Sequence, residues 1–429
     1  MAYEHEDLNQ RRESHRQEKA FLAKQRKLLR IGFIMTGITL VLCAATLLIT
    51  WGMLRPSDPN SGSSLEATTP PVTQAPTLPP VPDTVIHFVA GGDVNVTDQT
   101  IAAGNGTAGF DFTNVFMDIA PLLSAGDLTA VNFEGNLAGA PYGSATGSAP
   151  PELMTALKNT GVDLVQTANS YAVYNGMDGL QLTLQGIHSA GMTPVGTFAD
   201  AAEFNESGGF LIRQIQGIRI AVVAFTKGMD GMGLPAGSED CVNLLYKDFS
   251  STYQDVDKDG ITALLKATER YKPDVTIALL HWGSEYNDQI SKSQEKIIKT
   301  MKDAGVDAII GTHPHYVQKV VYNAEAGTLV AYSLGDLLGD AARAGSDYSV
   351  ILNMEITKSG TTGEVKITGF DYTPIYIVND TANGGNIRVV RIREAMAAYE
   401  ADSIGAVSKE IYEAMKSALS RIESRINGK

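Results

Sequence analysis

Two histidines flank a proline at the end of an apolar run. The chain holds seven histidines, and two of them, His313 and His315, occur in the stretch IIGTHPHYVQ. Side chains two residues apart on a strand point to opposite faces, but a turn after the strand would let both converge. Pro314 should hold His313 extended and make the pair rigid. Rigid, convergent imidazoles suit a metal ion, and the alternative is one capped and one solvent-exposed loop histidine.

Other polar residues stand where further apolar runs end. They are Asp93 after FVAGG, Glu134 after AVNF, His281 after IALL and Asp336 after AYSLG. Ligands of open α/β sheets bind outside the carboxyl ends of strands. Any single one of these residues could be a cap or turn residue, but carboxylates and imidazoles together form a set that suits Mn, Fe or Zn. A bridging carboxylate could hold two such ions, which would polarise a phosphoryl or acyl oxygen and activate water.

The elements that would position these residues begin near residue 84. Short runs such as IRIAVVAFT and VTIALLHWG are apolar throughout, and helical patterns such as ISKSQEKIIKTMKDAG alternate with them. In that helical pattern Ile290, Ile297, Ile298 and Met301 share one face, and Gly305 closes the end. Apolar runs between helices predict strands covered on both faces in an α/β domain over residues 84–390. Residues 348–378 alternate around a glycine-containing turn, which predicts a hairpin that closes a sheet. Residues 391–429 show a charged amphipathic helix pattern, expected on the outside of the domain.

The N-terminal part carries a membrane signal. Residues 31–54 are 24 residues without a charge, which as a helix of about 1.5 Å per residue would span roughly 36 Å. We predict an uncleaved transmembrane helix, with the basic leader 1–30 in the cytoplasm and the rest of the chain outside. A buried soluble helix is the alternative. Residues 55–83 are rich in Pro, Ser and Thr and predict an extended extracytoplasmic stalk.

Charge and cysteines narrow the class of protein. The chain has a net charge of −14, of which the first 30 residues contribute +3, so the remainder carries −17. Such an acidic body argues against nucleic acid as a partner. Cys43 lies in the predicted membrane segment, which leaves Cys241 alone outside. No intrachain disulfide is therefore expected in the external part.

Six blocks carry a family resemblance over roughly residues 85–338. GGDVN, NFEGNL, ANSYAVYNGMDGL, HWGSEY, GTHPHYVQ and YSLGDLL resemble, in order and spacing, the blocks of the bacterial capsule-synthesis CapA family, poly-γ-glutamate biosynthesis proteins with a calcineurin-like metallophosphoesterase fold. The resemblance implies a four-layer α/β sandwich and one or two divalent transition ions. It also implies a single-pass protein of the cell membrane, with polymer-synthesis membrane proteins as partners and an anionic polymer or phosphorylated substrate. The metal ligands that it implies are Asp93, Glu134, His281, His313 and His315.

The chain departs from the family pattern in one block. Where the family has Asn-Asn-His and an aspartate three residues further on, this chain has Asn169, Ser170, Tyr171 and then Tyr174. The second Asn normally binds metal and the His normally serves the chemistry. Tyr171 could donate a proton, but a phenol with a pKa near 10 is a poor match to neutral pH. Asp336 replaces a family Asn and offers an oxygen ligand.

Two functional hypotheses therefore stay open. One is an active metal-dependent phosphoesterase or amide hydrolase at the cell surface. The other, which the departures favour, is a metal-binding protein of polymer assembly that acts as a scaffold. Two further residues could line the site. Lys227 in the glycine-rich KGMDGMG could meet an anionic substrate or lie in a plain surface loop, and Glu285 could orient His281 or lie at the surface.

Overall fold

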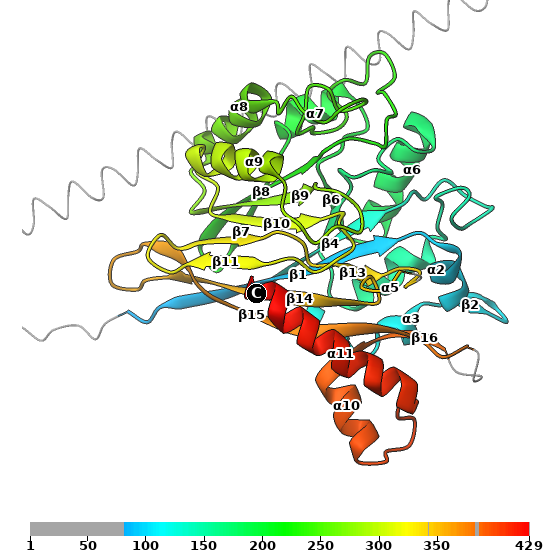
Figure 1. The fold of residues 1–429 in the computed structure, drawn as a ribbon. Coiled ribbons are helices and arrows are strands. Elements are labelled where there is room, and N and C mark those ends of the chain that lie inside the picture. The colour runs from blue at the N-terminus through cyan, green and yellow to red at the C-terminus, as the bar shows by residue number, and fades with distance from the viewer. Residues whose placement is uncertain (1–80, 342, 382–385, 429) are drawn as a thin grey trace, which may run out of the picture. The chain divides into compact units, whose positions relative to one another are not determined.

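The computed structural model describes residues 81–341, 343–381 and 386–428 (Figure 1). The predicted leader and transmembrane helix, and most of the predicted stalk, lie outside these residues. Among the helices in the described ranges, none is long and apolar enough to cross a membrane.

The first sheet combines parallel strands with an antiparallel edge. Its strands, in spatial order, are β16 (Ile387–Arg391), β15 (Val365–Asn379), β14 (Tyr348–Lys358), β1 (Thr84–Asn95), β4 (Leu128–Glu134), β5 (Leu164–Gln166) and β6 (Thr193–Val195). Strands β1, β4, β5 and β6 run parallel to one another, whereas β14, β15 and β16 pair antiparallel with their neighbours. The short strand β13 (Asp336–Leu338) pairs parallel with β1. The predicted hairpin is confirmed as β14 and β15.

The second sheet is parallel at its centre and antiparallel at both edges. Its strands, in spatial order, are β11 (Val320–Asn323), β12 (Thr328–Ala331), β10 (Ala308–Thr312), β9 (Val275–His281), β8 (Ile218–Thr226) and β7 (Leu211–Ile215). The two edge strands pair antiparallel with their neighbours, and the four between them are parallel.

Helices connect the parallel strands, as the alternating pattern predicted. The longer ones are α5 (Glu152–Asn159), α6 (Gly176–Ser189), α7 (Ala201–Ser207), α8 (Lys258–Thr268) and α9 (Lys292–Asp303). Shorter elements follow β1: α2 (Asp98–Ala103), the two-stranded ribbon of β2 (Asn105–Gly106) and β3 (Gly109–Phe110), α3 (Thr113–Phe116) and α4 (Ala120–Leu123). The 3₁₀ turn η1 (Glu269–Tyr271) follows α8.

Each central strand buries both of its faces. Successive residues of a strand point to opposite sides of the sheet, so they join different apolar clusters. On β9, Ile277 and Leu279 join the apolar cluster between the two sheets, whereas Ala278 and Leu280 join a cluster with α8 and α9. The first sheet shows the same division, with α3, α4 and α5 on its outer face. The predicted α/β class is confirmed: α3, α4 and α5 lie outside the first sheet, and α8 and α9 lie outside the second.

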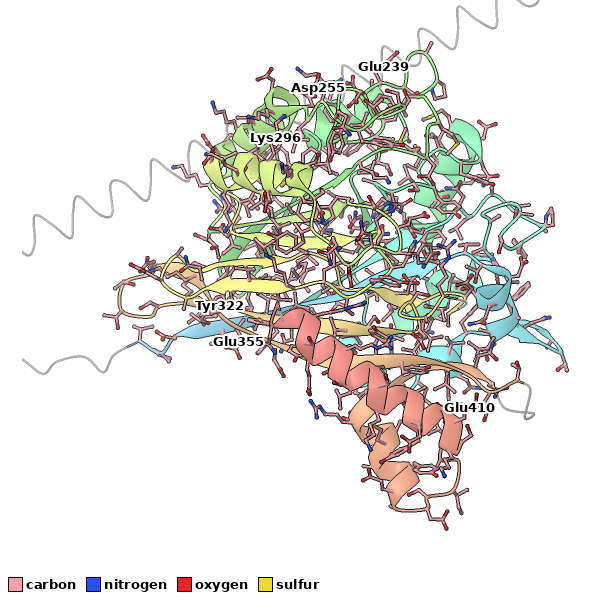
Figure 2. All side chains as sticks on the ribbon, viewed as in Figure 1. Glu239, Asp255, Lys296, Tyr322, Glu355 and Glu410 are labelled. Atoms are coloured by element: carbon pink, nitrogen blue, oxygen red, sulfur yellow. The ribbon has the colours of Figure 1, made fainter. Side chains whose placement is uncertain are left out.

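Local signals set the helix ends. Ser291 caps α9 in a capping box with Gln294, and Gly305 follows the helix with a positive φ of 84°. Ile297 and Met301 are buried on the predicted face. Exposed charges cover the outside of the molecule. Figure 2 shows Glu239 and Asp255 in the connection between β8 and α8, Lys296 on α9, Glu355 on β14 and Glu410 on α11.

The C-terminal amphipathic pattern forms two helices, α10 (Ile392–Glu400) and α11 (Lys409–Ile426). Figure 1 shows them, in orange and red, beside the antiparallel edge of the first sheet. The helix α10 contacts β15 and β16, and α11 contacts β14 and β15. Met415, Ala418 and Ile422 of α11 join the cluster between the sheets. These helices therefore cover apolar surface on the inner side of the first sheet.

Candidate metal centre

Six ionisable side chains meet where the strand ends of the two sheets come together. All five predicted ligands are among them, and each of the six is at most 5% exposed. They form two groups, and within each group the candidate ligand atoms all lie within 4.8 Å of one another. The first group is Glu134, His281 and His313, and the second is Asp93, His315 and Asp336. Both groups draw side chains from the first sheet and from the ends of strands in the second.

Asp336 reaches the site by a route that the sequence did not predict. The run TLVAYSLGD was expected to be one strand ending at Asp336. Instead β12 ends at Ala331, Gly335 turns the chain with a φ of 81°, and Asp336 begins β13 in the other sheet. A glycine suits this turn because positive φ carries no steric cost for it. Asp336 then lies opposite Asp93 in the parallel pair of β13 and β1.

The two histidines of the HPH stretch have left-handed backbones. The φ angles are 93° at His313 and 56° at His315, so the prediction that Pro314 holds His313 extended is wrong. Hydrogen bonds hold this conformation, since His313 N donates to Asp93 Oδ2 at 3.0 Å and Tyr286 N donates to the Pro314 carbonyl at 2.9 Å. The rings separate, with centroids 6.2 Å apart, and each joins a different group. The alternative of one solvent-exposed histidine is also wrong, since both are buried.

The first group contains a side chain without hydrogen-bond partners. His281 Nε2 lies 2.9 Å from Glu134 Oε1, and the His281 and His313 ring centroids are 4.4 Å apart. Both ring nitrogens of His313 are buried and make no hydrogen bond. Buried polar atoms are normally paired, so an imidazole with two unpartnered nitrogens calls for an explanation. A bound cation would supply the partner.

The second group is built around an imidazole and carboxylate pair. His315 Nδ1 lies 2.8 Å from Asp336 Oδ1, and Asn95 Nδ2 lies 3.3 Å from the same ring nitrogen. Glu134 Oε2 lies 3.9 Å from His315 Nε2, while its other oxygen contacts the first group. Glu134 is therefore the carboxylate placed to bridge the two groups.

Burial and neighbouring charges shift the pKa values of the cluster in both directions. Burial and neighbouring carboxylates raise the pKa of Asp93 to about 7, and burial raises that of Glu134 to about 8. Burial lowers the pKa of His281 to about 3 and that of His313 well below its ordinary value, so both are neutral imidazoles that can bind metal. Burial also lowers the pKa of His315, but the surrounding carboxylates outweigh this and raise it to about 11. A divalent ion would favour the ionised carboxylates and the neutral form of His315, so these residues fit one.

Two asparagines orient the ligands from behind. Asn132 Nδ2 donates to Asp93 Oδ1 at 2.6 Å, and Asn169 Nδ2 donates to Asn132 Oδ1 at 3.1 Å. Asn169 also donates to the Phe133 carbonyl at 2.6 Å and accepts from Tyr171 N at 2.9 Å. Asn169, predicted to line the site, thus supports it through Asn132.

Ser170 and Tyr171 occupy the block that departs from the family pattern. Ser170 Oγ lies 3.2 Å from His281 Nε2 and so borders the first group. Tyr171 is half-buried, and burial together with the charge of Glu134 raises the pKa of its phenol well above the ordinary value of 10. Tyr171 is therefore an even weaker acid than a free phenol.

Lys227 and Glu285 lie at the rim of the site. Lys227 follows β8, its Nζ lies 5.0 Å from the Tyr253 ring centroid, and burial lowers its pKa. Glu285 is exposed, and its negative charge raises the pKa of Glu134. The next residue, Tyr286, contacts the cluster directly, with its ring stacked on His315 at 4.9 Å.

Besides Asn95 and Asn132, the sequence reasoning missed Tyr286, Arg343 and Asp230. Arg343 places its guanidinium carbon 3.8 Å from the Tyr286 ring centroid. Asp230 accepts a hydrogen bond from Ser170 Oγ at 3.3 Å. The Asp-Gly dipeptide in KGMDGMG was a signal for Asp230, because it marks a tight turn just after a strand end. Nothing local marks Arg343, which reaches the site by tertiary packing.

Comparisons with known proteins agree with the sequence blocks. The model of the family described as bacterial capsule synthesis protein PGA_cap matches residues 87–341. The PGA biosynthesis protein CapA of Bacillus subtilis (strain 168) is 25% identical over 280 residues, which cover 62% of this chain and 68% of that protein. The capsule biosynthesis protein CapA of Bacillus anthracis is 27% identical over 214 residues, which cover 50% of this chain and 49% of that protein.

The solved structures that resemble this chain are less similar to it in sequence. The calcineurin-like phosphoesterase YfkN from Bacillus subtilis is 15% identical with a TM-score of 0.43, covering 80% of this chain and 98% of that chain. The 5'-nucleotidase from Candida albicans SC5314 is 10% identical with a TM-score of 0.39, covering 80% of this chain and 59% of that chain.

Proposed function

Because the chain belongs to the PGA_cap family of bacterial capsule synthesis proteins, we propose that it works in the assembly of a capsule or poly-γ-glutamate polymer. The protein is a single-pass membrane protein whose external domain binds one or two divalent transition ions. The uncharged segment 31–54 and the basic leader before it support the membrane anchor. Its partners are membrane proteins of polymer synthesis, and its ligand is an anionic polymer or a phosphorylated group.

The observation that carries this proposal is the pair of buried ligand groups around Glu134, with His313 left without hydrogen-bond partners. One ion would be held by Glu134, His281 and His313, and a second by Asp93, His315 and Asp336. A bound ion of this kind supplies Lewis acidity towards a phosphoryl or acyl oxygen and lowers the pKa of water. The placement of helices outside two facing sheets is also compatible with a four-layer sandwich of the metallophosphoesterase type.

The chain's own residues define what the site does to its ligand. Asn132 orients Asp93, and the neutral imidazoles of the first group present their nitrogens without losing a proton. Lys227 supplies a positive charge at the rim for an anionic group. Its ammonium is half-buried, so its attraction for such a group is less screened by water than that of a surface lysine.

We further propose that hydrolytic turnover is slow. General acid help is typically worth about 10²–10⁴-fold, and Tyr171 stands where the family has an imidazole. The pKa of Tyr171 is raised further by burial, so it holds its proton at neutral pH. The second candidate function, an active phosphoesterase or amide hydrolase, is favoured by the completeness of the two ligand groups.

Metal content and turnover of the purified full chain test both candidates. Metal analysis should find at least one Mn, Fe or Zn ion, and His313→Ala should lower the occupancy. The exposed histidine of α6, changed in His188→Ala, serves as the matched control and should leave the occupancy unchanged. Full occupancy in a His313→Ala, His315→Ala double variant would show that the cluster does not bind metal.

Turnover is measured on generic phosphodiester and amide substrates with each metal supplied in turn. We expect little activity from the unaltered chain and more from the double variant Ser170→Asn, Tyr171→His. Robust turnover by the unaltered chain that Tyr171→Phe leaves intact would support the hydrolase and reject the scaffold.

A further inference from the structure

A tight turn from the second sheet reaches the first ligand group. Met232 N donates to the Met229 carbonyl at 2.9 Å, and the two residues between them, Asp230 and Gly231, have φ angles of 48° and 83°. Positive φ at both central positions is the pattern of a type I′ turn, for which Asp-Gly is a preferred sequence. The turn gives Asp230 a defined backbone conformation.

Apolar packing holds this turn against the segment that carries Ser170. Met229 is fully buried and Met232 partly buried in a cluster that includes Ala172 and Val173, which follow Ser170 by two and three residues. On the other side, Gly231 N donates to Tyr253 Oη at 3.1 Å. The turn is therefore attached both to the chain segment after β5 and to the loop before α8.

Ser170 lies between Asp230 and the first group. Its Oγ donates to Asp230 Oδ1 at 3.3 Å and lies 3.2 Å from His281 Nε2. A hydroxyl has one proton and two lone pairs. When the proton is directed to Asp230, the lone pairs are left for the side that faces His281 and Glu134. A carboxylate acceptor also polarises the O–H bond, which makes the oxygen a better donor of electrons to a cation.

We infer that Asp230 is an outer carboxylate of the first ligand group, which directs the Ser170 hydroxyl so that its oxygen becomes a ligand of the ion held by Glu134, His281 and His313. The inference rests on the proposed metal binding. Serine at position 170 is shorter than the Asn of the family pattern. The carboxylate of Asp230, delivered from another loop, compensates by orienting and polarising that shorter ligand.

A plain surface role for Asp230 predicts something different. Asp230 is exposed, and an exposed carboxylate that acts only through its charge would influence a cation independently of Ser170. A positioning role through Ser170 requires that the effects of the two residues depend on each other. A double-mutant cycle separates the two cases.

The measurement is the zinc affinity of the purified full chain, determined by competition with a chromophoric chelator. The dissociation constants of the more tightly and the less tightly bound ion are fitted separately. Ser170→Ala and Asp230→Asn should each lower the affinity of one ion by about 10–100-fold, the usual effect of losing a supporting partner at a metal site. The double variant should be no weaker than Ser170→Ala alone. Asp240→Asn, an exposed acid in the same connection between β8 and α8, is the matched control and should have no effect.

A second background sharpens the test. In a Ser170→Asn chain the amide oxygen needs no carboxylate to orient it, so Asp230→Asn should then change the zinc affinity little. Equal losses from Asp230→Asn in the serine and asparagine backgrounds, or a double-variant loss equal to the product of the single losses, would overturn the inference.

Failure of the inference is distinct from failure of the proposed function. If the unaltered chain binds zinc, His313→Ala weakens the binding and Asp230→Asn leaves it unchanged, then the metal site stands and the role of Asp230 is wrong. If the unaltered chain binds no zinc, the proposed metal binding itself fails.

Discussion

Replacing His313 by alanine should separate metal binding from folding. In the metal-free protein two effects oppose each other. Truncating a buried ring leaves a cavity that costs up to ~3 kcal/mol. Removing two buried nitrogens that have no hydrogen-bond partners returns about 1–3 kcal/mol. We therefore expect the unfolding free energy of the metal-free variant to lie within ~2 kcal/mol of that of the unaltered chain.

The same replacement should remove most of the stabilisation by the ion of the first group. At an ion concentration of 100 times its Kd, a bound ion stabilises the native state by ~2.7 kcal/mol. If the loss of one imidazole weakens binding about 100-fold, the stabilisation at the same concentration falls to ~0.4 kcal/mol. The stabilisation by the ion of the first group should therefore nearly vanish in the variant.

Urea unfolding of the full chain, in a chelator and then with Zn or Mn, measures both quantities. His188→Ala should leave both unchanged, because His188 is exposed on α6. A loss above ~3 kcal/mol in the metal-free variant would mean that His313 is a core packing residue. An undiminished stabilisation by metal would mean that His313 is not a ligand.

Three further outcomes are expected. A protease added to intact cells should release a fragment that begins within residues 56–83, and complete protection of the chain would contradict the predicted topology. Gly92→Ala should destabilise the protein by about 3 kcal/mol or more in thermal unfolding, because the added Cβ would collide with the carbonyl oxygen of Gly335. Gly233→Ala is the control and should have little effect, because a Cβ at that position meets no atom within 4 Å. In the chelated protein, the unfolding free energy should fall as the pH rises from 6.5 to about 8, because the native state keeps protons that the unfolded chain releases. Urea unfolding at several pH values measures this, and an unfolding free energy that increases over this range would contradict it. The cluster residues with raised pKa are Asp93, Glu134, His315 and Asp336.

The sequence predicted the parts of the site that depend on local pattern. Apolar runs followed by a carboxylate or imidazole identified the strand ends of β4 and β9, because a covered strand must be apolar until it leaves the core. The same reasoning identified Asp93, although β1 continues to Asn95. The assignment of all five predicted ligands to one cluster followed from the parallel arrangement of the strands, which brings their carboxyl ends to the same edge.

The remaining features depend on tertiary structure. The change of sheet at Gly335 cannot be recognised in a run of nine residues that is apolar enough for one strand. The left-handed backbone of the His313–His315 stretch is held by hydrogen bonds with residues far away in the chain, such as the one that His313 N donates to Asp93. Asp230 meets Ser170 because Met229 and Val173 belong to one buried apolar cluster, although no local pattern connects these residues.

The origin of the ligands in both sheets has a kinetic consequence. The two groups join residues from Asp93 to Asp336, so neither group exists until strands of both sheets have paired and the chain between them has closed. Contacts of such long sequence separation form late, after the loop-closure entropy has been overcome. Interactions absent from the folding transition state change the unfolding rate and leave the folding rate nearly unaffected. A bound ion should therefore prolong the lifetime of the folded domain without accelerating its folding. Stopped-flow refolding and unfolding with and without metal would measure the two rates separately.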